Sequence, residues 1–178
     1  MINRRTKVAI AAIAGLSVLA ACSKPASTEA PSAPEAAAPA AEEAILPTGL
    51  TAKEQIEMRQ AQLKKLGKAF KTISDQLKSG SPDVAAIQEA AASVPVESAG
   101  MADWFPEGTG PDAGVKTDAL PIIWEDRADF EQKIADFRAA SDTLAATAAG
   151  GDLAAIGAAF GDTGGTCKSC HQKFRADD

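Results

Sequence analysis

Cys167-Lys168-Ser169-Cys170-His171 is the stretch that decides how the rest of the chain is interpreted. Its Cys-x-x-Cys-His spacing is the pattern used for covalent attachment of a c-type haem. Residues at i, i+3 and i+4 of a helix share one face, so both thiols can reach the two haem vinyl groups. His171 is the only histidine of the chain and can then reach the iron as its proximal ligand. We therefore expect one haem c, attached through Cys167 and Cys170, with His171 as the metal ligand.

Other uses of this cysteine pair fit its surroundings less well. A thioredoxin-like pair begins a helix that follows a strand, and no strand pattern precedes Cys167. A zinc site normally has four ligands, and the sequence has no second cysteine pair and no second histidine. A structural disulfide leaves the adjacent histidine unexplained. Haem attachment is the interpretation that uses all three side chains.

The residues before the motif predict an amphipathic helix that begins near Asp152. Its apolar stripe continues into the motif, because Cys167 lies one heptad past Phe160 and Phe174 lies one heptad further. The attachment points therefore face the core of the fold. The pair Gly164-Gly165 either weakens this helix or lets the macrocycle approach its backbone closely.

Three further amphipathic helices are predicted upstream. A capping box at Thr51–Glu54 starts the first helix, which Gly80 ends. The second runs over residues 81–98 and the third over 121–149, with a glycine-rich loop over 99–120 between them. Four such helices with one long crossover predict an all-α, antiparallel four-helix bundle with the covalently bound haem in its core. Their inward stripes contain Ile56, Leu63, Leu66, Phe70, Ile73, Leu77, Val84, Ile87, Ala91, Val94, Phe130, Ile134, Phe137, Ser141 and Leu144.

The N-terminus is a targeting segment rather than part of the fold. Arg4, Arg5 and Lys7 precede an apolar run that is too short for a membrane span. The run ends at Cys22 after small residues, which resembles the bacterial lipoprotein signal. This resemblance predicts lipidation of Cys22 and anchoring to the outer membrane. An ordinary secretory signal that leaves Cys22 as a free thiol is the alternative.

Three regions follow from these patterns. Residues 1–21 are predicted to be a lipoprotein-type signal peptide. Residues 22–48 are an Ala/Pro/Ser/Glu tether that cannot bury enough apolar surface to fold. Residues 49–178 are predicted to form the bundle.

Composition excludes several classes of function. A formal net charge of −6 and a pI of about 4.9 argue against nucleic acid as a partner. The sequence shows no paired catalytic carboxylates, nucleophile elbow or phosphate loop. We therefore do not expect an enzyme.

The sixth coordination position of the iron decides the function of such a protein. No second histidine is available, and the methionines outside the signal segment are Met58 and Met101. Met58 lies off the stripe that holds Ile56 and Leu63, and Met101 lies in the predicted loop. An open sixth position is thus the default, and a six-coordinate, low-spin electron carrier with a methionine ligand is the alternative.

From about Thr51 to Arg175 the chain resembles the cytochromes c′. The residues that carry this resemblance occur in four groups along the chain, at consistent spacing. They are Arg59-Gln60 with Leu63; Trp104-Phe105-Pro106 with Gly108-Thr109; Asp118-Ala119-Leu120-Pro121 with Trp124; and Phe160-Gly161 ahead of Cys167, Cys170, His171, Phe174 and Arg175.

The resemblance implies roles for individual residues. Leu63 takes the place of the apolar residue that blocks the distal face of the iron. Arg59 and Gln60 match positions that contact the haem edge or propionates, and Thr109 and Asp118 match loop positions near the haem. At the proximal side, Phe174 belongs to the family motif and Arg175 lies beside the iron-bound histidine.

The resemblance also implies a function. We expect a five-coordinate, high-spin haem protein that binds NO and CO, with electron transfer to transient redox partners in the periplasm. A homodimer through the first two helices is implied as well. The lipoprotein signal departs from the family, so a soluble periplasmic protein is the alternative to an anchored one. A plain electron carrier, a thiol–disulfide protein and a structural lipoprotein are the competing interpretations.

Overall fold

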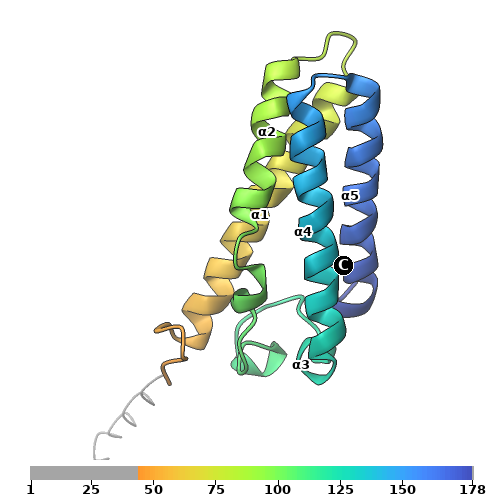
Figure 1. The fold of residues 1–178 in the computed structure, drawn as a ribbon. Helices are drawn as coiled ribbons and strands as arrows, with labels where there is room; N and C mark the ends of the chain where they lie inside the picture. The colour runs from red at the N-terminus through yellow and green to blue at the C-terminus, as the bar shows by residue number, and fades with distance from the viewer. Residues whose placement is uncertain (1–43, 178) are drawn as a thin grey trace, which may run out of the picture. The chain divides into compact units, whose positions relative to one another are not determined.

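The protein is described by a computed structural model, which covers residues 44–177. Four long helices run alternately up and down (Figure 1). Short turns join the first helix to the second and the third to the fourth, and a long crossover joins the second to the third at the opposite end. The predicted all-α four-helix bundle is confirmed. The four helices are α1 (Ala52–Leu77), α2 (Val84–Glu97), α4 (Arg127–Ala149) and α5 (Leu153–Phe174).

The predicted signal peptide, Cys22 and most of the predicted tether lie outside the described residues. The last residues assigned to the tether belong to the described part, where Ile45 forms an isolated β-bridge with Thr51. No helix within residues 44–177 combines the length and the apolar character that a membrane span requires.

The capping box at the start of α1 forms as predicted. The Thr51 hydroxyl accepts a hydrogen bond from the Glu54 backbone N–H at 3.2 Å, and the Glu54 carboxylate accepts one from the Thr51 N–H at 2.9 Å. These bonds satisfy two of the N–H groups that a helix start leaves without partners. Farther along α1, Ile56 and Ile73 are fully buried. Leu63, expected on the same buried stripe, is instead 39% exposed.

Two predicted helices differ from the observed ones. α2 begins at Val84 rather than at residue 81, because the Asp83 carboxylate accepts from the Ala86 N–H at 3.1 Å and caps the helix. The helix predicted over 121–149 is interrupted at Asp126, whose backbone (φ −121°, ψ 57°) is not helical. This break separates the short helix α3 (Ile122–Glu125) from α4.

A contact between distant segments accompanies this break. The Lys173 ammonium of α5 donates to the carboxylates of Asp126 at 2.6 Å and Asp129 at 2.9 Å. These two bonds tie the start of α4 to the end of α5. Hydrophobic periodicity predicts a continuous helix here. It misses the break because it carries no information about a contact partner more than forty residues away in the sequence.

The crossover is folded back onto the bundle. It contains two short 3₁₀ helices, η1 (Met101–Trp104) and η2 (Pro111–Ala113). The Trp124 indole N–H donates to the Pro106 carbonyl at 3.0 Å, and the Arg127 guanidinium donates to the Phe105 carbonyl at 2.8 Å. The predicted loop over 99–120 is therefore an ordered cap on one end of the bundle.

Helix packing leaves one pair of helices apart. α1 packs along α2, α2 along α4, and α4 along α5, whereas α1 and α5 make few contacts with each other. At the end far from the crossover, Ile73, Ile87, Leu144 and Ile156 fill the core. Toward the crossover end, residues from both α1 and α5 instead line a cavity.

Arg59 of α1 anchors the crossover. Its side chain is only 1% exposed. The guanidinium donates to the Thr109 hydroxyl at 2.9 Å, the Thr109 carbonyl at 2.8 Å and the Thr117 hydroxyl at 2.7 Å, and it lies over the Phe105 ring at 4.8 Å. Within residues 44–177 no carboxylate pairs with it. Burial lowers the pKa of Arg59 to about 10, so the group stays charged at neutral pH.

Replacing Arg59 tests this anchor. Arg59→Ala removes three hydrogen bonds and leaves the buried Thr109 oxygens without this donor. We expect the free energy of unfolding, measured with urea, to fall by about 2–4 kcal/mol. Arg138→Ala, on the exposed face of α4, is the control and should change it by less than about 0.5 kcal/mol. Equal stabilities of the two variants would contradict the anchoring role.

Candidate haem-binding site

Helix α5 presents the Cys-x-x-Cys-His motif to a cavity. It stays helical through Gly164 and Gly165, so the weakening considered for this pair is not observed. Cys167 and Cys170 are half-buried and pack against the core, and His171 is more exposed. All three side chains line the same cavity. The predicted arrangement on one helix face therefore occurs.

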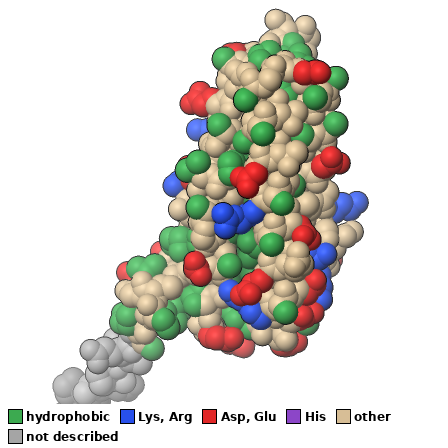
Figure 2. All heavy atoms as spheres, in the orientation of Figure 1, with side chains coloured by type: hydrophobic (Ala, Val, Ile, Leu, Met, Phe, Trp, Pro, Cys, Tyr) green, Lys and Arg blue, Asp and Glu red, His purple; other side chains and the backbone are tan. Residues whose placement is uncertain are grey.

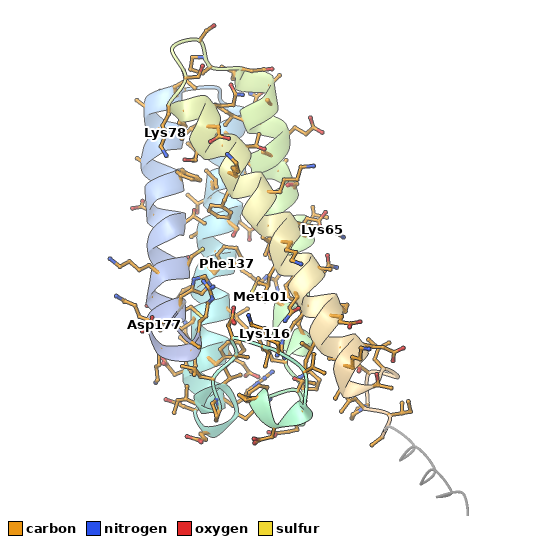
Figure 3. All side chains as sticks on the ribbon, turned by 180° about the vertical axis from the view of Figure 1, so that it is seen from behind. Lys65, Lys78, Met101, Lys116, Phe137 and Asp177 are labelled. Carbon is orange, nitrogen blue, oxygen red and sulfur yellow. The ribbon has the colours of Figure 1, made fainter. Side chains whose placement is uncertain are left out.

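The cavity has a volume of about 810 Å³ and lies toward the crossover end of the bundle. In Figure 3, Met101, Phe137 and Lys116 mark its position between α1 and the α4–α5 pair. One wall comes from α1 and the other from α4 and α5, and the crossover closes the end. The α1 wall is made by Gln60, Leu63, Lys64, Leu66, Gly67 and Phe70, and the opposite wall includes Lys133, Ile134, Phe137, Gly164, Thr166, Cys167, Cys170 and His171.

The cavity fits a haem in size and chemistry. Its volume is within the range of cofactor sites, and its walls combine apolar side chains with a few polar groups. Two thiols one helical turn apart and one imidazole are the donor set of c-type attachment. Gly67 and Gly164 line opposite walls, and a methyl group on either would meet no atom within 4 Å. A flat macrocycle can thus approach both backbones closely.

The two thiols are poorly suited to redox exchange. Burial raises the pKa of Cys167, and burial together with the neighbouring Cys167 raises the pKa of Cys170 to about 11. Thiol–disulfide exchange requires the thiolate, which a raised pKa disfavours at neutral pH. The environment of the pair therefore argues against a thioredoxin-like role.

The end of α5 is held next to the loop that carries Asp118. The Arg175 guanidinium pairs with the Asp118 carboxylate at 3.5 Å. The Leu120 N–H donates to the Phe174 carbonyl at 3.0 Å, and the Ala176 N–H donates to the Asp118 carbonyl at 2.8 Å. Burial, and to a lesser degree Arg175, lowers the pKa of His171. Both effects favour the neutral imidazole, the form that can bind a metal ion.

The cavity brings together most of the residues that the sequence predicts for the site. Besides the motif, these are Gln60, Leu63, Asp118 and Arg175.

Arg59, Thr109 and Phe174 do not reach the cavity wall. Arg59 and Thr109 bond to each other within the crossover anchor. Phe174 is 2% exposed and packs edge-to-face on Phe130 at 5.1 Å. These three side chains have packing and anchoring contacts in this geometry, and their haem contacts stay predictions.

Other residues of the wall are not among the site residues that the sequence predicts. Phe70, Ile134 and Phe137 belong to the predicted core stripes, which are the signal in the sequence that places them near a cofactor in the core. Met101 and Lys116 come from the crossover, where residue spacing carries no information about position.

Comparison with known proteins identifies the family. Residues 54–175 match the family described as Cytochrome C′. A cytochrome c′ from Allochromatium vinosum is 39% identical over 131 residues, which cover 72% of this chain and 84% of the relative.

Solved structures agree with this match. A cytochrome c′ with ligand-controlled dimer dissociation superposes with a TM-score of 0.69 at 35% identity, covering 72% of this chain and 99% of that one. The nitric oxide complex of a leucine-to-alanine variant of cytochrome c prime from Alcaligenes xylosoxidans gives a TM-score of 0.64 at 32% identity, covering 71% and 97%. Motif, bundle and relatives lead to one conclusion: the chain belongs to the cytochrome c′ family of c-type haem proteins, and its single haem is attached covalently through Cys167 and Cys170.

Proposed function

We propose that this protein binds NO and CO at a five-coordinate haem and exchanges electrons with transient redox partners in the periplasm. When bound through His171, the haem supplies an iron atom with one free coordination position. The observation that carries the proposal is the composition of the α1 wall, where the aliphatic Leu63 and Leu66 lie beside Gly67. Leu63 and Leu66 have no atom that can bind iron, and Gly67 has no side chain. Lys64 on the same wall is exposed to solvent. The chain also has no histidine besides His171.

The α1 wall also favours selectivity among gases. Leu63 has no group that can donate a hydrogen bond to a polarised ligand such as O₂. The α1 wall has two polar side chains: the Gln60 amide already donates to the Lys116 carbonyl at 2.9 Å, and Lys64 is exposed to solvent. NO and CO depend less on such a donor, and we expect them to bind while O₂ is held poorly.

Relatives support this proposal. The structure from Alcaligenes xylosoxidans is a nitric oxide complex, and another relative shows dimer dissociation controlled by a ligand. For this protein we propose a homodimer through α1 and α2, where Val96 is 72% exposed on the surface of α2. We propose no enzymatic turnover.

A six-coordinate electron carrier is the second candidate, and the position of Met101 is the observation that favours it. Met101 lines the cavity from η1 and could supply a thioether ligand. Met58 does not line it and packs against the core. The two candidates therefore differ in what Met101 does.

Truncating Leu63 tests the cap. In Leu63→Ala, CO no longer has to displace a side chain whose movement costs about 1.4 kcal/mol, so the association rate of the ferrous protein should rise about tenfold. Stopped-flow absorbance measures this rate. Ile45→Ala, which shortens an exposed aliphatic residue outside the cavity, should leave it unchanged. An equal rate in wild type and Leu63→Ala would show that Leu63 does not cap the site.

Replacing Met101 separates the two candidates. Met101→Leu conserves volume, so a five-coordinate protein keeps its high-spin optical spectrum in both oxidation states. A methionine-ligated protein instead loses its low-spin bands. Met58→Leu is the matched control and should have no effect in either case. A spectral change confined to the Met101 variant would overturn the proposed function.

We further propose that Cys22 carries a lipid that anchors the protein to the outer membrane. The apolar run that ends directly at this cysteine supports the proposal. Expressed in a bacterium with lipoprotein processing, the protein should sediment with membranes, and mass spectrometry should find an acylated N-terminal Cys22. Cys22→Ala should release it into the soluble periplasmic fraction, with the haem spectrum unchanged. An unmodified Cys22 in a soluble wild-type protein would favour an ordinary secretory signal.

A further inference from the structure

We propose that Gly67 controls the rate at which CO and NO bind, by leaving the space into which the Leu63 side chain moves. This inference rests on the proposed function, in which Leu63 caps the free side of the haem. Gly67 lies one helical turn after Leu63 on α1, and both residues line the cavity.

Among the neighbours of Leu63 on the helix surface, one position is open. Residues three and four positions away surround a helical side chain, and here they are Arg59, Gln60, Leu66 and Gly67. Arg59 is 1% exposed and held by three hydrogen bonds. Leu66 is 6% exposed within the core, and the Gln60 amide is bonded to Lys116. The one remaining position has no side chain.

The geometry at Gly67 matches this role. A Cβ atom there would meet nothing within 4 Å. Helical side chains lean toward the N-terminus, so a side chain at position 67 would lie over the turn that carries Leu63. Leu63 itself is 39% exposed, so the protein's own side chains cover it only in part.

The backbone gives no other reason for glycine at this position. Gly67 lies in the interior of a regular helix and is not among the glycines with positive φ. Glycine destabilises a helix interior relative to alanine. The absence of a side chain therefore serves the cavity, where it lets the haem approach α1 and also leaves room for the displaced Leu63 side chain.

The rate of CO binding to the ferrous holoprotein tests the inference. Gly67→Ala should slow association about fivefold, because displaced Leu63 must adopt a strained rotamer, and Gly67→Leu should slow it further. Gly157→Ala, in α5 outside the cavity, is the matched control. Both alanine variants should raise the melting temperature through helix propensity, but only the Gly67 variant should bind CO more slowly.

A double mutant distinguishes this mechanism from simple blockage. In a Leu63→Ala background no side chain has to move, so adding Gly67→Ala should leave the fast rate unchanged. The inference is overturned if Gly67→Ala binds CO at the wild-type rate, or if it slows binding equally in both backgrounds. A wild-type protein that binds no CO would refute the proposed function itself. CO binding to the wild-type protein is measured before any variant, so this failure is distinguished from failure of the inference about Gly67.

Discussion

Covalent attachment of a rigid, flat cofactor to one helix is the constraint on which the rest of this structure depends. The two thiols that hold the haem and His171, the predicted iron ligand, lie on one face of α5. A macrocycle on that face needs space in front of it. The bundle provides this space by keeping α1 and α5 apart, whereas α1 packs on α2, α2 on α4, and α4 on α5. The cofactor thus takes the place of a helix–helix contact in the core.

Polar contacts at the crossover end hold the helices in place around this space. Arg59 connects α1 to the crossover, Arg127 connects the crossover to α4, and Lys173 connects α4 to α5. Each of these side chains is a cation that donates to two or more oxygen atoms on another segment. In Figure 2, acidic and basic side chains gather toward this end of the bundle, where α3 lies, and mix with hydrophobic ones elsewhere on the same face. At this end the charged contacts add to an apolar core cluster that includes Phe105, Phe130 and Phe174.

The two walls of the cavity have different roles in the proposed function. α5 binds the cofactor through groups that cannot be exchanged without losing attachment. α1 contributes only side chains that face the free side of the haem, so its residues can tune gas binding without disturbing the bond to His171. The small and aliphatic residues of α1 at the cavity, together with the exposure of Leu63, are consistent with a wall that yields to an incoming ligand. In this view, the rate of gas binding depends on how easily one side chain moves.

The sequence by itself determined the features that depend on residue type at fixed local spacing. Examples are the haem motif, the capping box at Thr51 and the buried stripe of α4. Residues three or four positions apart on a helix are neighbours whatever packs against that helix. Only the tertiary structure decided the features that arise where distant segments meet. The break at Asp126, the direction of Arg59 toward Thr109 rather than the cavity, and the entry of Met101 into the cavity wall all depend on such meetings. Hydrophobic periodicity describes one helix at a time, and which residue from the crossover meets that helix is set only when the whole bundle packs.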